Sequence, residues 1–302
     1  MADETLFLVA LHSVVGMGHQ PLQRLIDRYG TAERAVMQCA DSELRLIPGL
    51  TADVRKRVLA CRERLPWAER VVAQMGRLGV RLILFDRPGY PARLKQLSSP
   101  PRVLYAIGDT ALLDGPTAAI VGSTTPSEKG RALASEIARR LARSDCAVVS
   151  GMAKGTDLAA HRGALEAGGR TAFILPTGIL HFKPGADLPP AKEWMERAVV
   201  LSECAPEAEW SSNAAVARNR LIAALGGALI VVETRAKGGA MYTFRHAQQL
   251  ERPIFVVHYE KPPPSASGNN FALAQGGLPL TRLADVQAVI AAVRSPHATP
   301  PS

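Results

Sequence analysis

Residues 118–161 decide the fold, and they read AAIVGSTTPSEKG to Gly130, RALASEIARRLARSD to Asp145 and CAVVSGMAKGTDLAAH to His161. Twice in this stretch a short apolar run ends in a turn of small residues, and a pattern with helical spacing follows. Strands, turns and helices in alternation are typical of α/β proteins. The stretch therefore predicts a doubly wound, mainly parallel sheet.

Both turns fall at the carboxyl ends of predicted strands, where open α/β sheets bind ligands. Their Gly and Ser residues leave backbone N–H groups accessible, and the helix N-terminus behind each turn adds the positive end of a dipole. Lys129 and Lys154 add positive charge. The pattern indicates a phosphate site, although glycines that only permit tight turns are the simpler interpretation. Neither turn has the spacing of the dinucleotide fingerprint or the P-loop.

The composition favours a globular protein with an acidic partner. The 302 residues carry a formal net charge of +9, and hydrophobic residues make up 47%. The charge suggests a polyanion, although a generally basic, Arg-rich proteome would also account for it. Aromatic residues are only 5% of the chain, which argues against a broad base-stacking platform.

The four cysteines, Cys39, Cys61, Cys146 and Cys204, are far apart and have no histidine at ligand spacing. We therefore expect no metal site and no cofactor, and the thiols fit a reducing, cytoplasmic setting. The N-terminus has no signal-peptide pattern. No apolar run approaches the ~18 residues of a membrane helix, so no membrane association is expected.

Residues 5–65 show helical spacing, with glycine turns at Val15–Gly18 and Ile47–Asp53. Such turns are typical of helix-hairpin-helix modules that contact DNA phosphates, and plain α-hairpins look the same. We expect an all-helical domain over residues 1–70, which resembles SAM or helix-hairpin-helix modules. An α/β domain over 71–295 and a disordered tail over 296–302 follow it.

Short motifs recur in a fixed order along the chain. They are Gly122-Ser123 with Pro126-Ser127 and Gly130; Val149-Ser150-Gly151 with Gly155, Asp157 and His161; Ser202-Glu203; Arg218-Asn219-Arg220; Val231-Val232-Glu233; Gly239 with Thr243; and Gly268 with Asn270. Each motif is weak alone, but in this order they resemble the DprA or Smf family of DNA-processing proteins. The likeness runs from Leu6 to Val293, and the chain resembles a divergent member without the C-terminal winged-helix domain.

This resemblance implies a small helical domain followed by an extended Rossmann-like domain. It also implies a protein that binds single-stranded DNA, forms a homodimer through the Rossmann-like domain and loads RecA recombinase onto DNA during natural transformation. The family has no established catalytic activity, so no catalytic residue is expected. For the dimer, the segment from Leu280 to Val293 offers an apolar surface.

The turns and the resemblance together predict a set of residues that bind DNA phosphates. They are Gly122, Ser123, Thr124, Ser127, Lys129, Gly151, Lys154, Gly155, Arg218, Asn219, Arg220, Lys237, Gly239 and Asn270. Lys154 and Arg218 match basic positions of the family. The chain departs from the family at Thr124, where an arginine is usual, and at Gly238, where a serine is usual.

Several charged and polar residues near the two turns could have a structural role instead of binding a ligand. Arg218 and Arg220 point apart, so one is expected in the pocket and the other beside a carboxylate such as Glu203 or Glu233. These two glutamates are expected at the ends of neighbouring strands. His161 is expected to be buried and neutral. Asp157 is expected to cap its helix.

A second function stays open. The wider fold group includes nucleotide sensors and phosphoribohydrolases, which would use the two glycine turns for one phosphate. The hydrolases usually carry a Pro-Gly-Gly-x-Gly-Thr segment, and the stretch from Ser150 to Thr156 is only loosely similar. This weak similarity to the hydrolase motif favours a DNA-binding protein. A role in anti-phage defence also stays open.

Overall fold

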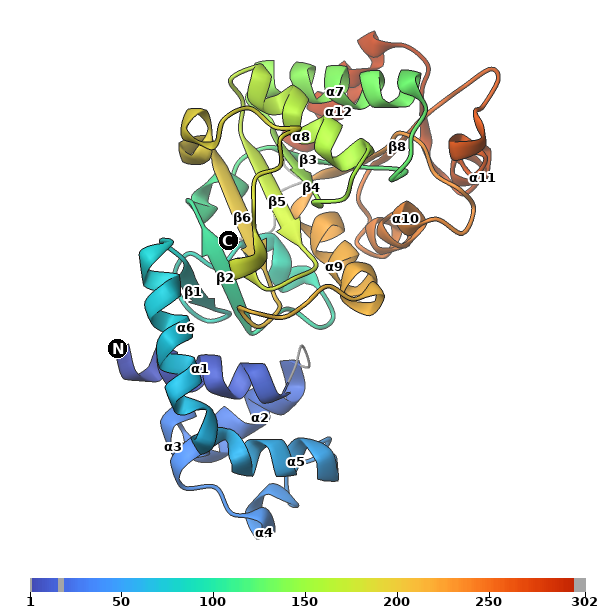
Figure 1. The fold of residues 1–302 in the computed structure, drawn as a ribbon. Coiled ribbons are helices and arrows are strands. Elements are labelled where there is room, and N and C mark those ends of the chain that lie inside the picture. The colour runs from blue at the N-terminus through green and yellow to red at the C-terminus, as the bar shows by residue number, and fades with distance from the viewer. Residues whose placement is uncertain (1, 16–18, 296–302) are drawn as a thin grey trace.

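The computed structural model describes residues 2–15 and 19–295, and a group of helices lies beside a large sheet (Figure 1). The helices of this group are α1 (Ala2–Val15), α2 (His19–Tyr29), α3 (Ala32–Met37), α4 (Asp41–Leu44), α5 (Ala52–Leu59) and α6 (Leu65–Arg77). They confirm the helical character expected for residues 5–65. α6 runs across residue 70, where we expect a domain boundary. The expected tail and residues 16–18 of the first glycine turn lie outside the described residues.

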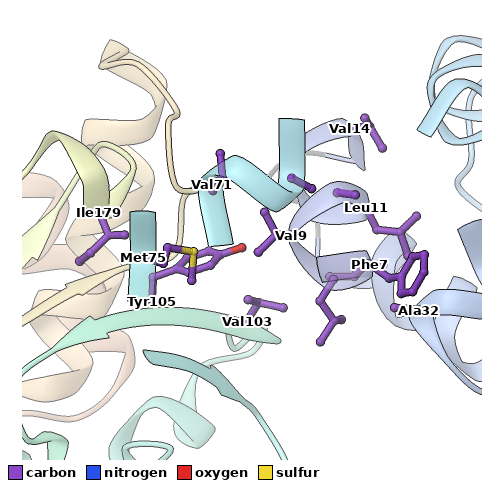
Figure 2. Packing of buried hydrophobic residues seen from close by; sticks show 14 of the residues in the cluster. Phe7, Val9, Leu11, Val14, Ala32, Val71, Met75, Val103, Tyr105 and Ile179 are labelled. Carbon is purple, nitrogen blue, oxygen red and sulfur yellow. The ribbon is translucent and has the colours of Figure 1, made fainter. Parts of the chain in front are cut away.

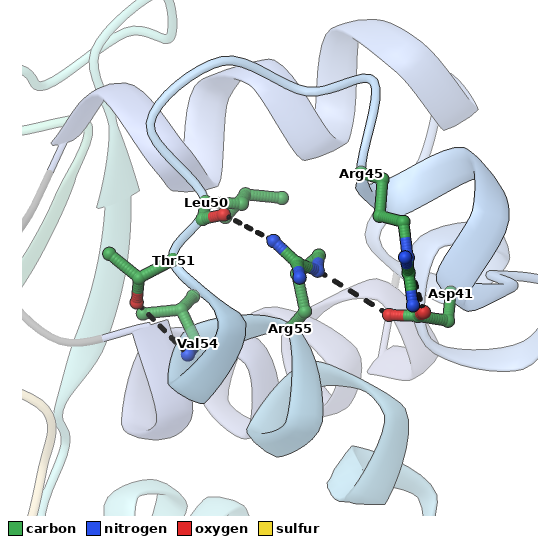
Figure 3. Close-up of polar contacts among 6 residues, drawn as sticks. All are labelled: Asp41, Arg45, Leu50, Thr51, Val54 and Arg55. Carbon is green, nitrogen blue, oxygen red and sulfur yellow. Dashed lines mark hydrogen bonds and ion pairs between the residues drawn. The ribbon is translucent and has the colours of Figure 1, made fainter.

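The second glycine turn, which precedes α5, is held by side chains of the helical group itself (Figure 3). Thr51 caps α5, because its Oγ1 accepts a hydrogen bond from the Val54 N–H at 3.3 Å. Arg55 donates to the Leu50 carbonyl at 2.9 Å and to the Asp41 carboxylate at 3.4 Å. Arg55 therefore stabilises this turn.

The strands of the described residues form one sheet, in the order β1-β2-β6-β5-β4-β3-β7-β8-β9. The strands are β1 (Arg81–Leu84), β2 (Val103–Ile107), β3 (Thr117–Val121), β4 (Ala147–Ser150), β5 (Thr171–Leu175), β6 (Ala198–Ser202), β7 (Ala228–Val231), β8 (Ile254–Val257) and β9 (Leu278–Leu280). From β6 to β9 all neighbours are parallel, whereas β2 pairs antiparallel with both β1 and β6. The sheet is thus mostly parallel and doubly wound, as the sequence predicts.

β3 lies in the middle of the sheet and is the strand at which the winding changes direction. The chain moves from β3 through β4 and β5 to β6 on one side, and it returns to the other side of β3 with β7, β8 and β9. The carboxyl ends of β3 and β7 therefore border a topological switch point, where open sheets of this kind leave a crevice.

Helices cover both faces of the sheet. α7 (Glu128–Arg143), α8 (Thr156–Glu166) and α12 (Val286–Arg294) pack on one face, and α9 (Ser212–Leu225) and α10 (Gly239–Gln249) pack on the other. α11 (Asn269–Ala274) lies next to β8. Short 3₁₀ turns connect these elements: η1 (Ala60–Arg64), η2 (Ala92–Gln96), η3 (Thr110–Leu113), η4 (Ile179–His181), η5 (Ala191–Glu193), η6 (Met195–Arg197), η7 (Pro264–Ala266) and η8 (Leu283–Asp285).

The helical group and the sheet share one hydrophobic cluster (Figure 2). Val9 of α1 and Val71 and Met75 of α6 are buried together with Val103 and Tyr105 of β2. Burial of apolar surface is the main stabilising contribution in folding. The shared cluster therefore fixes α6 against the sheet.

The apolar residues near the end of the chain are buried inside the molecule. Val286, Val289, Ile290 and Val293 of α12 and Leu280 of β9 belong to the cluster between α12 and the sheet. The prediction that this segment offers an apolar surface for a dimer is wrong, because these side chains complete the protein's own core. No helix in the described part of the chain is long and apolar enough to span a membrane.

Candidate functional site

A cavity of about 330 Å³ opens at the switch point, and we call it the switch-point pocket. It lies at the carboxyl ends of β3, β4 and β5, between α9 and the N-terminus of α10. The residues that define it are Gly122, Thr124, Asp157, Arg218, Asn219 and Gly239. The structure therefore brings together five of the residues that the sequence predicts for phosphate binding, and it adds Asp157.

Two glycines allow the walls of this pocket to approach one another. A Cβ atom on Gly122 would lie 2.5 Å from Thr156 Oγ1, and a Cβ atom on Gly151 would lie 1.7 Å from an Arg218 nitrogen. Thr156 also donates to the Ser123 carbonyl from both its N–H and its hydroxyl, at 3.1 and 3.0 Å. The first glycine turn is thereby fixed against the second.

Arg218 reaches the pocket from α9 and is almost completely buried, with 6% of its surface exposed. One terminal N–H donates to the Ile174 carbonyl at 2.8 Å. Burial lowers the pKa of the guanidinium, and Asp157 beside it opposes this shift. Burial likewise raises the pKa of Asp157, and Arg218 opposes that shift. No described residue accepts a hydrogen bond from Arg218 Nε.

A second buried polar atom in the pocket is also without a partner. Thr243 of α10 is 1% exposed, and its hydroxyl has no hydrogen-bond partner among the described residues. The N-terminus of α10 lies beside it, and its N-cap residue, Gly238, has no side chain to cap the helix. Buried polar groups in proteins are nearly always hydrogen-bonded. A guanidinium N–H, a hydroxyl and uncapped helix N–H groups together fit an anion with several oxygens.

Trp210 stands at the mouth of the pocket with 62% of its surface exposed. The sequence analysis does not include this residue among the site residues, because the low aromatic content of the chain argues against base stacking. A lone tryptophan in the polar segment before α9 was the available signal. Its indole ring could stack on a base whose phosphate lies deeper in the pocket.

Lys154 and Gly155 line a different cavity, of about 670 Å³, between α7 and α8. Arg131 and Arg162 also line it, and Thr124 belongs to both cavities. The two predicted basic residues, Lys154 and Arg218, are therefore not in one pocket. Thr124 is the wall between them.

The N-terminus of α7, where the sequence predicts a phosphate, already holds a carboxylate. Glu233 is fully buried and accepts hydrogen bonds from the Ser127 N–H at 2.8 Å and the Ser127 hydroxyl at 2.5 Å. Ser265 donates to the same carboxylate at 2.6 Å. Ser127 also caps α7 by accepting from the Gly130 N–H. Lys129 lies outside both cavities, 5.6 Å from the ring of Tyr259.

Arg220, which is partly buried, forms an ion pair with the buried Glu203. Burial raises the pKa of Glu203 to about 7, and Arg220 opposes the shift. This confirms that one of the two α9 arginines enters the pocket and the other pairs with a carboxylate. The expectation that Glu203 and Glu233 end neighbouring strands is wrong, because β5, β4 and β3 lie between β6 and β7.

The remaining predicted residues lie apart. Lys237 and Asn270 line neither of the two cavities, and Asn270 is exposed. Its neighbour Asn269 is buried instead, and it accepts from the Thr234 N–H and donates to the carbonyls of β8 and of the residue after β7. The structural asparagine of this segment is therefore residue 269.

His161 is fully buried, as expected, and burial lowers its pKa to about 3. Its Nε2 lies 2.6 Å from the Gly151 carbonyl, which can only accept, so this nitrogen carries the proton. Its Nδ1 lies 2.7 Å from the Thr171 hydroxyl. The expectation for Asp157 is wrong: Gly155 is the N-cap of α8, and Asp157 accepts from the Ala153 N–H at 3.4 Å.

The cysteines and the acidic residues do not form a metal centre in the part of the chain that the structure describes. All four cysteines are buried and reduced. No group of three or more histidine, cysteine, aspartate or glutamate residues there could hold a metal ion.

The parallel sheet, its winding about β3 and the pocket at the switch point define a Rossmann-like α/β protein. The family model described as DNA recombination-mediator protein A matches residues 81–291. The chain belongs to this family, the DprA/Smf DNA-processing proteins.

The similarity extends over most of the chain. It is 31% identical to the DNA processing protein DprA of Bacillus subtilis over 222 residues, which are 73% of this chain and 75% of that protein. It is 29% identical to the protein Smf of Synechocystis over 84% of this chain and 65% of that protein. The chain thus spans 75% and 65% of the length of these two relatives.

Two solved structures share the fold. The DNA processing protein A of Streptococcus pneumoniae superposes with a TM-score of 0.73 at 25% identity, over 94% of this chain and 97% of that one. The DNA processing protein A of Helicobacter pylori gives a TM-score of 0.61 at 27% identity, over 70% and 96%. The latter structure is described as showing a single-stranded DNA binding mode.

Proposed function

We propose that this protein binds single-stranded DNA through the switch-point pocket and acts as a recombination mediator without catalytic activity of its own. The observation that carries the proposal is the pair of buried polar groups in the pocket, Arg218 Nε and Thr243 Oγ1, which have no partner among the described residues. Membership of the family, the single-stranded DNA binding mode of the Helicobacter relative and the net charge of +9 support it.

In this proposal a phosphate of the strand enters the pocket beside Arg218. The guanidinium donates from Nε, the α10 N-terminus donates backbone N–H groups, and the Thr243 hydroxyl donates the remaining bond. Trp210 stacks on the base at the mouth. The strand continues past Thr124 towards Lys154 in the cavity between α7 and α8.

We also propose the wider role that the family suggests. The strand is protected and handed to a RecA-type recombinase, as in natural transformation. Residues 1–70 and 71–295 serve as a helical domain and a DNA-processing domain, and the protein acts as a homodimer.

Titrations with single-stranded DNA, duplex DNA and mononucleotides test the proposal. Single strands should bind most tightly, and contact with about four to six phosphates should give a log–log salt slope of roughly −3 to −4. Lys154→Ala should weaken binding, whereas Lys192→Ala, an exposed lysine on η5 that lines neither cavity, should not. Equal affinity for duplex, or a flat salt response, would contradict the pocket model.

The size of the pocket supports a second candidate. A volume of about 330 Å³ is at the lower end for small-molecule sites, so a single nucleotide could fill it. In that case the protein would be a nucleotide sensor or a phosphoribohydrolase. Mononucleotide binding that exceeds DNA binding in the same titration would favour this function.

A further inference from the structure

The surface of α6 carries arginines that the pocket does not explain. Seven basic and three acidic residues lie between Ala52 and Arg77. On α6 itself Arg70 and Arg77 are seven residues apart, which is two helical turns, so they lie on one face. Both are exposed. Among the described residues no carboxylate is within ion-pair distance of either one.

These arginines line a groove of about 510 Å³, together with Trp67 and Gln74 of α6 and Glu207 of the segment that joins β6 to α9. Trp67 Nε1 donates to the Glu207 carboxylate at 2.7 Å. Arg64 lies over the Trp67 ring, 4.6 Å from its centre. The groove is therefore fixed at the end nearest the β6–α9 segment, and its charged side chains extend from there along α6.

The same β6–α9 segment also carries Trp210 at the mouth of the switch-point pocket. Glu207 and Trp210 are three residues apart, which is at most about 11 Å of chain. From Trp67 to Arg77 the helix rises about 15 Å. The pocket and the far end of the groove are thus about 25 Å apart by this path, which a stacked strand spans with about seven or eight phosphates at 3.4 Å each.

We propose that the α6 groove is a second contact for the single strand whose phosphate occupies the switch-point pocket. This inference rests on the proposed function of the pocket. Arg70 and Arg77 are about 10.5 Å apart along α6, so they would bind phosphates about three positions apart on the strand, as charged, sequence-independent partners. A strand too short to reach α6 would bind through the pocket alone.

The test is the affinity of variants for oligothymidines of 4 and 20 nucleotides. The double variant Arg70→Gln/Arg77→Gln should bind the 20-mer about tenfold more weakly and the 4-mer like the wild type. Its salt slope for the 20-mer should fall by about 1.4, for two lost phosphate contacts. The matched control is Arg34→Gln/Arg143→Gln, which removes the same charge from exposed positions on α3 and α7 and should leave both affinities unchanged.

A gain-of-contact variant guards against loss of structure. Gln74→Lys adds a charge within the groove, so it should tighten binding of the 20-mer about threefold and leave the 4-mer unchanged. Equal effects on both lengths, or no difference between the double variant and its control, would overturn the proposal. A third outcome would also overturn it: polyglutamate competes with the 20-mer for the wild type, and the double variant keeps its full affinity for the 20-mer. The groove would then bind an acidic protein segment. If the wild type binds neither oligonucleotide, it is the pocket's proposed function that fails.

Discussion

Thr243 shows how a single buried atom can indicate where a ligand binds, because its hydroxyl lines the switch-point pocket without a partner among the described residues. A buried hydroxyl without a partner lowers stability by about 1–3 kcal/mol. We therefore expect Thr243→Val, which keeps the shape, to leave the free energy of unfolding unchanged or raise it by up to about 1 kcal/mol. DNA affinity should fall about three- to tenfold, for one neutral hydrogen bond. Urea unfolding measures the stability and a DNA titration on the same sample measures the affinity. A variant that loses stability and keeps its DNA affinity would show that Thr243 does not bind the ligand.

Thr124 is the residue at which the two cavities meet. Thr124→Arg should tighten single-strand binding by about 1 kcal/mol, because a charged bidentate contact replaces a neutral one and the longer side chain must be ordered. The salt slope should steepen by about 0.7. If the pocket instead holds a mononucleotide, the arginine should block it, so that nucleotide binding disappears and DNA affinity stays the same.

His161 and His12 are buried as neutral side chains, and burial lowers their pKa values to about 3 and about 4. In the unfolded chain each histidine binds a proton with its ordinary pKa of 6.5, whereas in the folded protein it stays neutral at that pH. Stability is therefore fully present above pH 6.5 and is lost as the pH falls. We expect a loss of about 1.4 kcal/mol per pH unit for each histidine between about pH 6 and 4. Urea unfolding across this range should show the slope, and His161→Leu should remove about half of it.

At the scale of elements, Glu233 joins the first turn of α7 to the residues after β7. Gly130 lies so close that a Cβ atom there would be 2.2 Å from the Glu233 carboxylate. Gly130→Ala should therefore lower the free energy of unfolding by about 1–3 kcal/mol, as overpacking does.

Gly76→Ala in α6 is the matched control. No atom lies within 4 Å of the position that a Cβ would take there, and alanine is the better helix former. This variant should be more stable than the wild type by up to about 1 kcal/mol. Thermal unfolding of both variants measures the difference, and equal effects would show that the Glu233 contact does not restrict α7.

The sequence predicted the elements better than their contacts. The apolar runs of β3 to β8 are visible because both faces of these strands are buried, and the opposite roles of Arg218 and Arg220 follow from helical geometry. The contact between Ser127 and Glu233 joins residues 106 positions apart, so it depends on the winding of the sheet and could not be predicted locally. Whether the Thr243 hydroxyl has a hydrogen-bond partner depends on all the residues that surround it in the fold, so no local sequence pattern could predict it.

At the scale of the whole molecule, three exposed apolar side chains lie near the β8–β9 end of the sheet. Tyr242 of α10, Phe271 of α11 and Leu278 of β9 are each about half exposed. We expect the protein to be a homodimer through this end. Light scattering should give about twice 32.3 kDa. Phe271→Glu should give the monomer, whereas Leu46→Glu, an exposed position in the helical group, should not. A monomer mass at all micromolar concentrations would exclude the dimer.

During synthesis β3 cannot pair with β7 until the residues of β7 have been made. Ala118 of β3 pairs with Ala228 of β7, about 110 residues later, and a ribosome that adds about 5–20 residues per second needs about 5–20 s to make that segment. During this interval one edge of β3 is open, and neither Arg218 nor Thr243 has followed it into place. The pocket is therefore completed only after Thr243 has emerged, and a shorter growing chain has no complete site for a phosphate.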